Sequence, residues 1–175
     1  MSRRRIGMEE TKTKLKVYCE TSFWSYLVGG STADEKIARW QCLTQKWHQQ
    51  EMPLCDVFVS DYVIQEARLG DAAHAAKRME ALRGVPKLAA VPESTVPIAE
   101  KLLSAHALPP DEKTDALHIA TAAYHKMDVL LTWNCRHLAN LFTLPKTMAV
   151  VASLGYSCPL IITPERYMED MRHDL

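Results

Sequence analysis

The hydrophobic positions of this chain follow two patterns, short apolar runs and longer segments with apolar residues three or four positions apart. Short apolar runs are typical of buried β-strands, and the longer periodic segments are typical of helices. Four runs predict strands: residues 15–19, 56–60, 87–91 and 128–132. Two more apolar runs lie near the C-terminus, at residues 148–152 and 160–163, and leave room for a fifth strand.

Helical segments lie between these runs. The clearest covers residues 33–49, in which Ile37, Trp40, Leu43 and Trp47 recur at helical spacing. The other predicted helices cover residues 61–69 (stopping at Gly70), 71–83, 94–106 (with Ser94 as N-cap and Pro97 in the first turn), a segment capped by Asp111 or Thr114 that ends near His125, and a last short helix at 164–168.

Strands that alternate with helices predict a parallel sheet with helices on its faces. We therefore expect a three-layer α/β/α domain around a mostly parallel sheet of four or five strands. The length of 175 residues fits one domain, and the sequence has no internal repeat and no long linker. Residues 15–175 are predicted to form this domain, and residues 1–14 a flexible leader.

Composition excludes several classes of protein. No apolar run approaches the ~20 residues of a membrane-spanning helix, and the basic N-terminal stretch lacks the apolar core of a secretory signal. Basic and acidic residues number 21 each, which argues against a broad cationic surface for nonspecific nucleic-acid binding. The number of cysteines is odd, at five, and none forms a C-x-x-C pair, which favours reduced thiols in the cytoplasm over disulfides or zinc.

Three acidic residues stand far apart in the chain, each where a strand or loop meets a helix. They are Glu20 in VYCETSFWSYL, Glu66 in VSDYVIQEARLGD and Asp115 in the segment that leads to LLTWNCRH. Asn134 directly follows the strand predicted at 128–132. Because ligands of open α/β sheets bind outside the carboxyl ends of the strands, these side chains can meet at one rim. Asp128 is an alternative fourth acid, but it begins the same strand and therefore lies at the opposite end of the sheet.

These segments resemble the PIN-domain ribonucleases, and within them the VapC-like toxins of toxin–antitoxin pairs. The resemblance rests on ETSFWSYL after a strand, the Glu of VIQEARLGD, the Asp of DALHIATAA and the loop LLTWNCRHLAN, and it extends from Val17 to about Thr163. It implies a PIN-like fold, cytoplasmic location, and hydrolysis of RNA by water activated by Mg²⁺ or Mn²⁺. It also implies a homodimer and a cognate antitoxin protein as partners.

The resemblance assigns roles to four residues. Glu20, Glu66 and Asp115 match three acidic positions of the family and are expected to bind the metal, and Asn134 matches a fourth catalytic position that is often Asp. Mg²⁺ prefers hard oxygen ligands and retains several waters, so a few carboxylates suffice. The chain departs from the pattern twice, because Glu20 is one methylene longer than the usual Asp and Asn134 is neutral. We therefore expect one firmly held cation, with a second that is weakly bound or recruited by the substrate phosphate.

Asp115 and Glu66 also have ordinary structural explanations. Asp115 near a helix N-terminus would interact favourably with the helix dipole even without a metal. Glu66 could pair with Arg68 or Lys77, whereas an unpaired Glu20 after a buried strand would be costly.

Neighbouring residues are candidates for contacts to the acids or to RNA, and each has a competing role in capping, packing or a solvated loop. Thr21 and Ser22 could instead cap the first helix, and His118 could simply pack. Trp133 is the best candidate for base stacking, whereas the other tryptophans are better explained as core or dimer surface. The candidates are Thr21, Ser22, His118, Thr132, Trp133 and Arg136, with His137 beside the last.

Two functions of different classes follow. The first is a metal-dependent endoribonuclease. The second is a PIN-like module with weakened metal binding that binds RNA or protein, and Glu20 and Asn134 are the residues that favour it. A metal phosphatase ranks below both, since it would usually carry an Asp nucleophile after the first strand.

Overall fold

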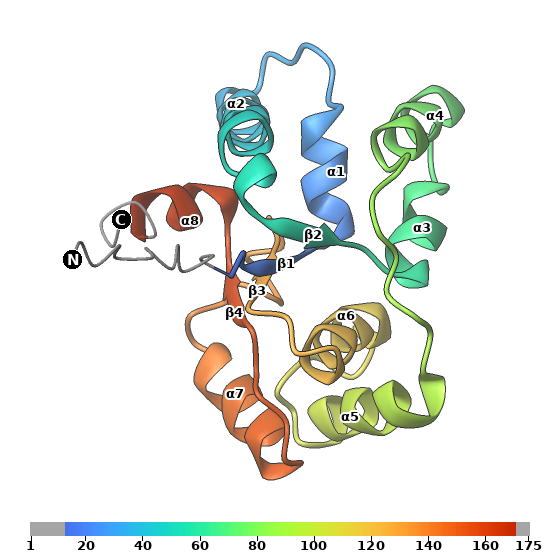
Figure 1. Ribbon diagram of the computed structural model, residues 1–175, viewed down its shortest axis with the longest axis vertical. Coiled ribbons are helices and arrows are strands. Elements are labelled where there is room, and N and C mark those ends of the chain that lie inside the picture. The colour runs from blue at the N-terminus through green and yellow to red at the C-terminus, as the bar shows by residue number, and fades with distance from the viewer. Residues whose placement is uncertain (1–12, 171–175) are drawn as a thin grey trace, which may run out of the picture.

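The central feature of the fold is a parallel sheet that runs through the middle of the molecule (Figure 1). The computed structural model describes residues 13–170, and in this range the sheet has four strands in the order β2-β1-β3-β4. All of their pairings are parallel. The strands are β1 (Lys16–Cys19), β2 (Asp56–Phe58), β3 (Val129–Leu131) and β4 (Leu160–Ile162).

Helices cover both faces of the sheet, so the predicted three-layer α/β/α architecture is confirmed. Figure 1 shows α1, α2 and α8 on one side of the sheet and α5, α6 and α7 on the other, with α3 and α4 beside α1. Their bounds are α1 (Thr21–Leu27), α2 (Glu35–Gln50), α3 (Asp61–Ala67), α4 (Ala72–Ala81), α5 (Pro92–Ser104), α6 (Lys113–Tyr124), α7 (Leu144–Ser153) and α8 (Pro164–Asp170), with a 3-10 turn at Met52–Leu54. The leader predicted at residues 1–14 lies almost entirely outside the described residues.

Several helices begin at a side chain that accepts a backbone N–H. Asp34 caps α2, Ser60 caps α3 and Asp71 caps α4 in this way. The expected caps of the next two helices were wrong. Helix α5 begins at Pro92 rather than at Ser94, because proline suits the first helical position, and α6 begins after Glu112 without a side-chain cap.

Two sequence patterns were misassigned or left unassigned. Residues 87–91 do not form a strand, because only Lys87 pairs, in an isolated bridge with Val59. This segment lies between Pro86 and Pro92 and buries mainly Leu88, so it offers little to a sheet. Residues 148–152 lie in α7, which buries Thr147 and Val151 one turn apart. The segment at residues 160–163 supplies β4.

The core forms around the two middle strands. Val17, Tyr18 and Cys19 of β1 are fully buried, as are Leu130 and Leu131 of β3. A strand buried on both faces reads as a continuous apolar run, which explains why these strands were evident in the sequence. None of the helices in the described range has the length and apolarity needed to cross a lipid bilayer.

The central position of β3 leads to a prediction about the stability of the protein. Leu130→Ala should lower the free energy of unfolding by about 2–5 kcal/mol, because the side chain is fully buried and its removal leaves a cavity. Urea denaturation followed by circular dichroism measures the change. The control is Leu160→Ala in the neighbouring strand, whose side chain is 50% exposed and whose loss should cost about 1 kcal/mol or less. Equal losses in the two variants would contradict this picture of the core.

Candidate metal and catalytic site

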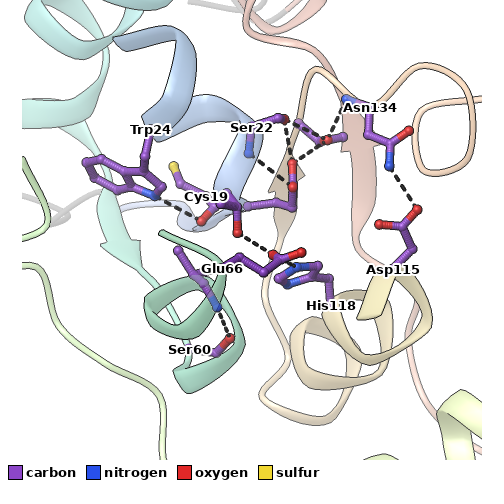
Figure 2. Close-up of polar contacts among 12 residues, drawn as sticks. Cys19, Ser22, Trp24, Ser60, Glu66, Asp115, His118 and Asn134 are labelled. Carbon is purple, nitrogen blue, oxygen red and sulfur yellow. Dashed lines mark hydrogen bonds and ion pairs between the residues drawn. The ribbon is translucent and has the colours of Figure 1, made fainter. Parts of the chain in front are cut away.

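The sheet brings the predicted site residues together at the carboxyl ends of its middle strands. Glu20 follows β1, Asn134 follows β3 by three residues, Asp115 lies in the first turn of α6, and Glu66 lies near the end of α3. Figure 2 shows Glu66 beside His118, and Asn134 with its amide pointing at Asp115. Side chains separated by more than a hundred positions in the sequence therefore face one region.

Glu20 is nearly buried, and hydrogen bonds from three donors hold its carboxylate. Its Oε2 accepts from Ser22 Oγ at 2.5 Å and from Thr132 Oγ1 at 2.7 Å, and its Oε1 accepts from the Ser22 backbone N–H at 3.0 Å. Glu20 is thus itself the N-cap of α1. Only 6% of the residue is exposed, so these bonds replace the water that a carboxylate would otherwise bind.

Glu66 is held through one of its two oxygens. His118 Nε2 lies 2.8 Å from Oε2, and Thr21 Oγ1 donates to the same oxygen at 2.5 Å. Burial acts to raise the pKa of Glu66, but the bonds from His118 and Thr21 outweigh it and the pKa is lowered. Glu66 therefore pairs with His118 rather than with Arg68 or Lys77.

Asp115 is held by the loop after β3. Asn134 Nδ2 donates to Asp115 Oδ2 at 2.8 Å, and His137 Nδ1 lies 3.2 Å from the same oxygen. His137 Nδ1 also lies 3.1 Å from Glu112 Oε1. Burial raises the pKa of Asp115, and although His118 opposes this effect, the negative charges of Glu20 and Glu112 add to it.

The potential metal ligands form two groups among residues 13–170. In one group, ligand atoms of Glu20, Glu66 and His118 all lie within 4.8 Å of one another, and the other group joins Glu112, Asp115 and His137 in the same way. Asp115 thus stands beside the pair of glutamates rather than in one tight cluster with them, although Glu20 is close enough to raise its pKa.

This arrangement fits a divalent cation. Glu66 and Asp115 each accept their hydrogen bonds through one oxygen, which leaves Glu66 Oε1 and Asp115 Oδ1 without a hydrogen-bond partner among the described residues. Such half-used carboxylates are the hard oxygen donors that Mg²⁺ and Mn²⁺ prefer. A cation beside Asp115 would also offset the negative charges of Glu20 and Glu112, which add to the effect of burial on its pKa.

The remaining candidate residues differ in whether they contact the three acids. Ser22 and Thr132 bind Glu20, and Thr21 binds Glu66, so the alternative that Thr21 or Ser22 caps α1 was wrong. Arg136 is exposed beside the site, and its side chain makes no hydrogen bond or ion pair with the described part of the chain. Asp128 accepts from the Lys16 backbone N–H at 2.8 Å, at the opposite end of the sheet.

Trp133 does not fit the base-stacking role expected from the sequence. The residue is only 4% exposed, its ring stacks on Trp40 with centroids 4.8 Å apart, and its Nε1 donates to Thr44 Oγ1 at 2.7 Å. An RNA base cannot reach a ring whose face and N–H are already used. The aromatic contact instead anchors the loop that carries Asn134 against α2.

Sequence reasoning missed Glu112 and gave His137 only a minor place. Glu112 lies three residues before Asp115, directly before α6, and His137 lies three residues after Asn134 in the loop after β3, so each is a close neighbour in the sequence of a predicted site residue. That spacing was the available indication. It was obscured because a polar residue before a helix and a polar residue in a loop are both common.

Comparison with known proteins identifies the family of the chain. The model of the PIN domain family matches residues 17–137, a range that includes Glu20, Glu66, Asp115 and Asn134, and the chain belongs to this family. No curated protein sequence matches the chain significantly. Among solved structures it is similar to Mycobacterium tuberculosis VapC20, a sarcin-ricin loop cleaving toxin, with a TM-score of 0.48 and 20% identity over 65% of this chain and 86% of that chain.

The electrostatic coupling between Glu20 and Asp115 can be tested directly. Because the negative charge of Glu20 disfavours ionisation of Asp115, Glu20→Gln should lower the pKa of Asp115 in the metal-free protein. Carboxyl ¹³C NMR during a pH titration measures this pKa. Glu93→Gln, an exposed change in the first turn of α5, should leave it unchanged. An unaltered or raised pKa in Glu20→Gln would show that the two carboxylates do not interact.

Proposed function

We propose that this PIN-domain protein is an endoribonuclease that depends on Mg²⁺ or Mn²⁺ and acts as the toxin of a toxin–antitoxin pair. The observation that carries the proposal is the convergence of Glu20, Glu66 and Asp115, from three separate elements, at the carboxyl end of the sheet of a PIN-family chain. Carboxylates that meet in this way are poorly explained by solvation alone, since two of them are nearly buried.

The chain's residues divide the work in the proposed reaction. Glu20, Glu66 and Asp115 hold the cation, and Ser22, Thr132 and Thr21 fix the glutamate oxygens. A divalent cation held by these residues would neutralise charge on the RNA phosphate and lower the pKa of bound water, the nucleophile of the hydrolysis. No side chain then has to act as the general base.

Asn134 and Arg136 complete the proposed site. Asn134 fixes Asp115 by donating to it, which keeps that carboxylate in one orientation. The exposed Arg136 on the same loop offers a cation for RNA phosphates, a contact that positions the strand without reading its sequence.

The proposed partners follow from the toxin assignment. They are an RNA substrate, a cognate antitoxin protein that covers the site, and a second copy of the chain in a homodimer, all in the cytoplasm. A reading frame for a small DNA-binding protein directly beside this gene would support the antitoxin.

One observation favours a second function. Asn134 contributes no charge at a position where a fourth acid would strengthen metal binding, so the chain could serve as an RNA-binding or protein-binding module with little catalysis. The two functions differ in a simple respect, because the module binds RNA without cutting it.

Loss of a ligand carboxylate provides the main test. Asp115→Asn should reduce Mn²⁺-dependent cleavage of a panel of structured RNAs by at least about a hundredfold, because the neutral amide neither attracts nor holds the cation. Chelation of the metal should abolish cleavage by the unmodified protein. The matched control is Asp128→Asn at the other end of the sheet, which should retain activity. Cleavage that survives chelation, or full activity in Asp115→Asn, would refute the mechanism.

Restoring a fourth carboxylate tests the role of Asn134. Asn134→Asp should tighten Mn²⁺ binding roughly tenfold, because it adds a ligand charge, and should lower the melting temperature of the metal-free protein, because it replaces a donor to Asp115 with a like charge. Calorimetric titration and thermal melting measure the two effects. Gln45→Glu, the same amide-to-acid change at an exposed position of α2, is the control that should change neither. Weaker Mn²⁺ binding in Asn134→Asp would mean that the amide contact matters more than the added charge.

A further inference from the structure

A buried series of polar side chains extends from Glu66 into the core. His118 Nε2 lies 2.8 Å from Glu66 Oε2, His118 Nδ1 lies 2.7 Å from the Tyr18 hydroxyl, and that hydroxyl lies 2.6 Å from Ser60 Oγ. Tyr18 and His118 are completely buried and Ser60 is 3% exposed. Three polar groups in a core have to satisfy one another, and this series does so from end to end.

The Glu66 end of the series determines the direction of the first hydrogen bond. Burial opposes a charge on His118, but the hydrogen bond to Glu66 and the charges of Glu20, Glu66 and Asp115 outweigh it and raise the pKa of His118. An ionised carboxylate only accepts, so His118 Nε2 carries the hydrogen in the bond to Glu66. In a neutral imidazole the other nitrogen is then an acceptor, and the Tyr18 hydroxyl donates to it. Ser60 can donate in turn to the Tyr18 oxygen. Every group in the series therefore has a partner.

We propose that Tyr18 and Ser60 are positioning residues for the candidate metal ligand Glu66, acting through His118. By its hydrogen bond to Nδ1, Tyr18 fixes the plane of the ring in which Nε2–H faces Glu66. The inference rests on the proposed function, since it assumes that Glu66 binds the cation. It adds to the site two residues that lie beneath it and touch none of the reacting groups.

The same geometry assigns His118 a role as a donor rather than as a metal ligand. Its Nε2 is close enough to Glu20 and Glu66 to be considered a ligand. However, both ring nitrogens are already engaged in hydrogen bonds, and the residue is fully buried at the base of the site. A histidine that donates to a ligating carboxylate fixes its orientation, as is common around metal sites.

The series also fixes the helix that carries Glu66. Ser60 is the N-cap of α3, and Glu66 lies near the end of that short helix. Tyr18 belongs to the central strand β1 and His118 to α6. One chain of hydrogen bonds thus joins both ends of α3 to the two elements that position Glu20 and Asp115, so the distance between the ligands is set by the core.

Removing the Tyr18 hydroxyl tests the proposal. Tyr18→Phe should weaken Mn²⁺ binding by up to about tenfold, since loss of a ligand's direct partner costs about 10- to 100-fold and Tyr18 acts one step further away, through His118. Electron paramagnetic resonance counts free Mn²⁺ during a titration. Tyr167→Phe is the matched control, because Tyr167 is also buried and loses a hydrogen bond, to Cys55, but lies away from the site. Its Mn²⁺ affinity should equal that of the unmodified protein.

Each outcome has a distinct meaning. Equal affinities in Tyr18→Phe and Tyr167→Phe would overturn the positioning role, whereas no Mn²⁺ binding by the unmodified protein would instead refute the proposed function. Should Tyr18→Phe not fold, Ser60→Ala provides the second variant and should weaken Mn²⁺ binding in the same direction. Long-range ¹H–¹⁵N NMR of the unmodified protein should show the His118 hydrogen on Nε2, and a hydrogen on Nδ1 alone would also overturn the proposal.

The donor and ligand roles of His118 are separated by a further variant. The side-chain amide of Gln in His118→Gln retains an N–H for Glu66 at the position of Nε2, so it should bind Mn²⁺ more tightly than His118→Ala. Electron spin-echo modulation of the Mn²⁺-loaded protein detects nitrogen coordinated to the cation. This signal should be the same in the unmodified protein and in His118→Gln. The loss of such a nitrogen would establish His118 as a ligand and contradict the donor role.

Discussion

The parallel pairing of β1 with β3 is the constraint on which the candidate site depends. In this register Cys19 pairs with Leu131, and the backbone N–H of Glu20 donates to the Leu131 carbonyl at 3.1 Å. Glu20 and Thr132 therefore leave the sheet together, and their side chains meet at 2.7 Å. A shift of one residue would turn one of these side chains to the other face of the sheet. The buried apolar residues of both strands exclude that shift, so the hydrophobic core sets the geometry of the polar site.

The carboxylates gathered by this register would repel one another, and neutral donors hold them in place. Ser22 and Thr132 donate to Glu20, Thr21 to Glu66 and Asn134 to Asp115. These donors fix orientation without cancelling the negative charge, and the pKa of Asp115 is raised by burial and by the charges of Glu20 and Glu112. A site that keeps its charge and also holds its carboxylates rigidly is suited to a cation, because little reorganisation is needed when the cation binds.

The sequence predicted those features that depend on local pattern or on strand ends. The buried runs of β1 and β3, the three-layer fold and the meeting of Glu20, Glu66 and Asp115 at one rim all follow from such patterns. Tertiary packing decided the rest. The apolar run at 148–152 became part of α7, and Trp133 was drawn into the core by Trp40 and Thr44. The contact of Tyr18 with His118 joins residues a hundred positions apart, and no local pattern could have indicated it.

The contacts of Asn134 bear on whether a site with three acids and an amide, instead of four acids, can still hold a cation. In a site that had merely lost an acid, the replacement would have no particular contacts. Here both ends of the amide are used, since Nδ2 donates to Asp115 and Oδ1 accepts from the His137 backbone N–H at 3.0 Å. An aspartate at this position could not donate to Asp115, and two carboxylates so close would favour uptake of a proton. Asn134 thus gives up a charge and in return orients a carboxylate. That exchange supports the proposed metal-dependent nuclease over the alternative PIN-like module with weakened metal binding.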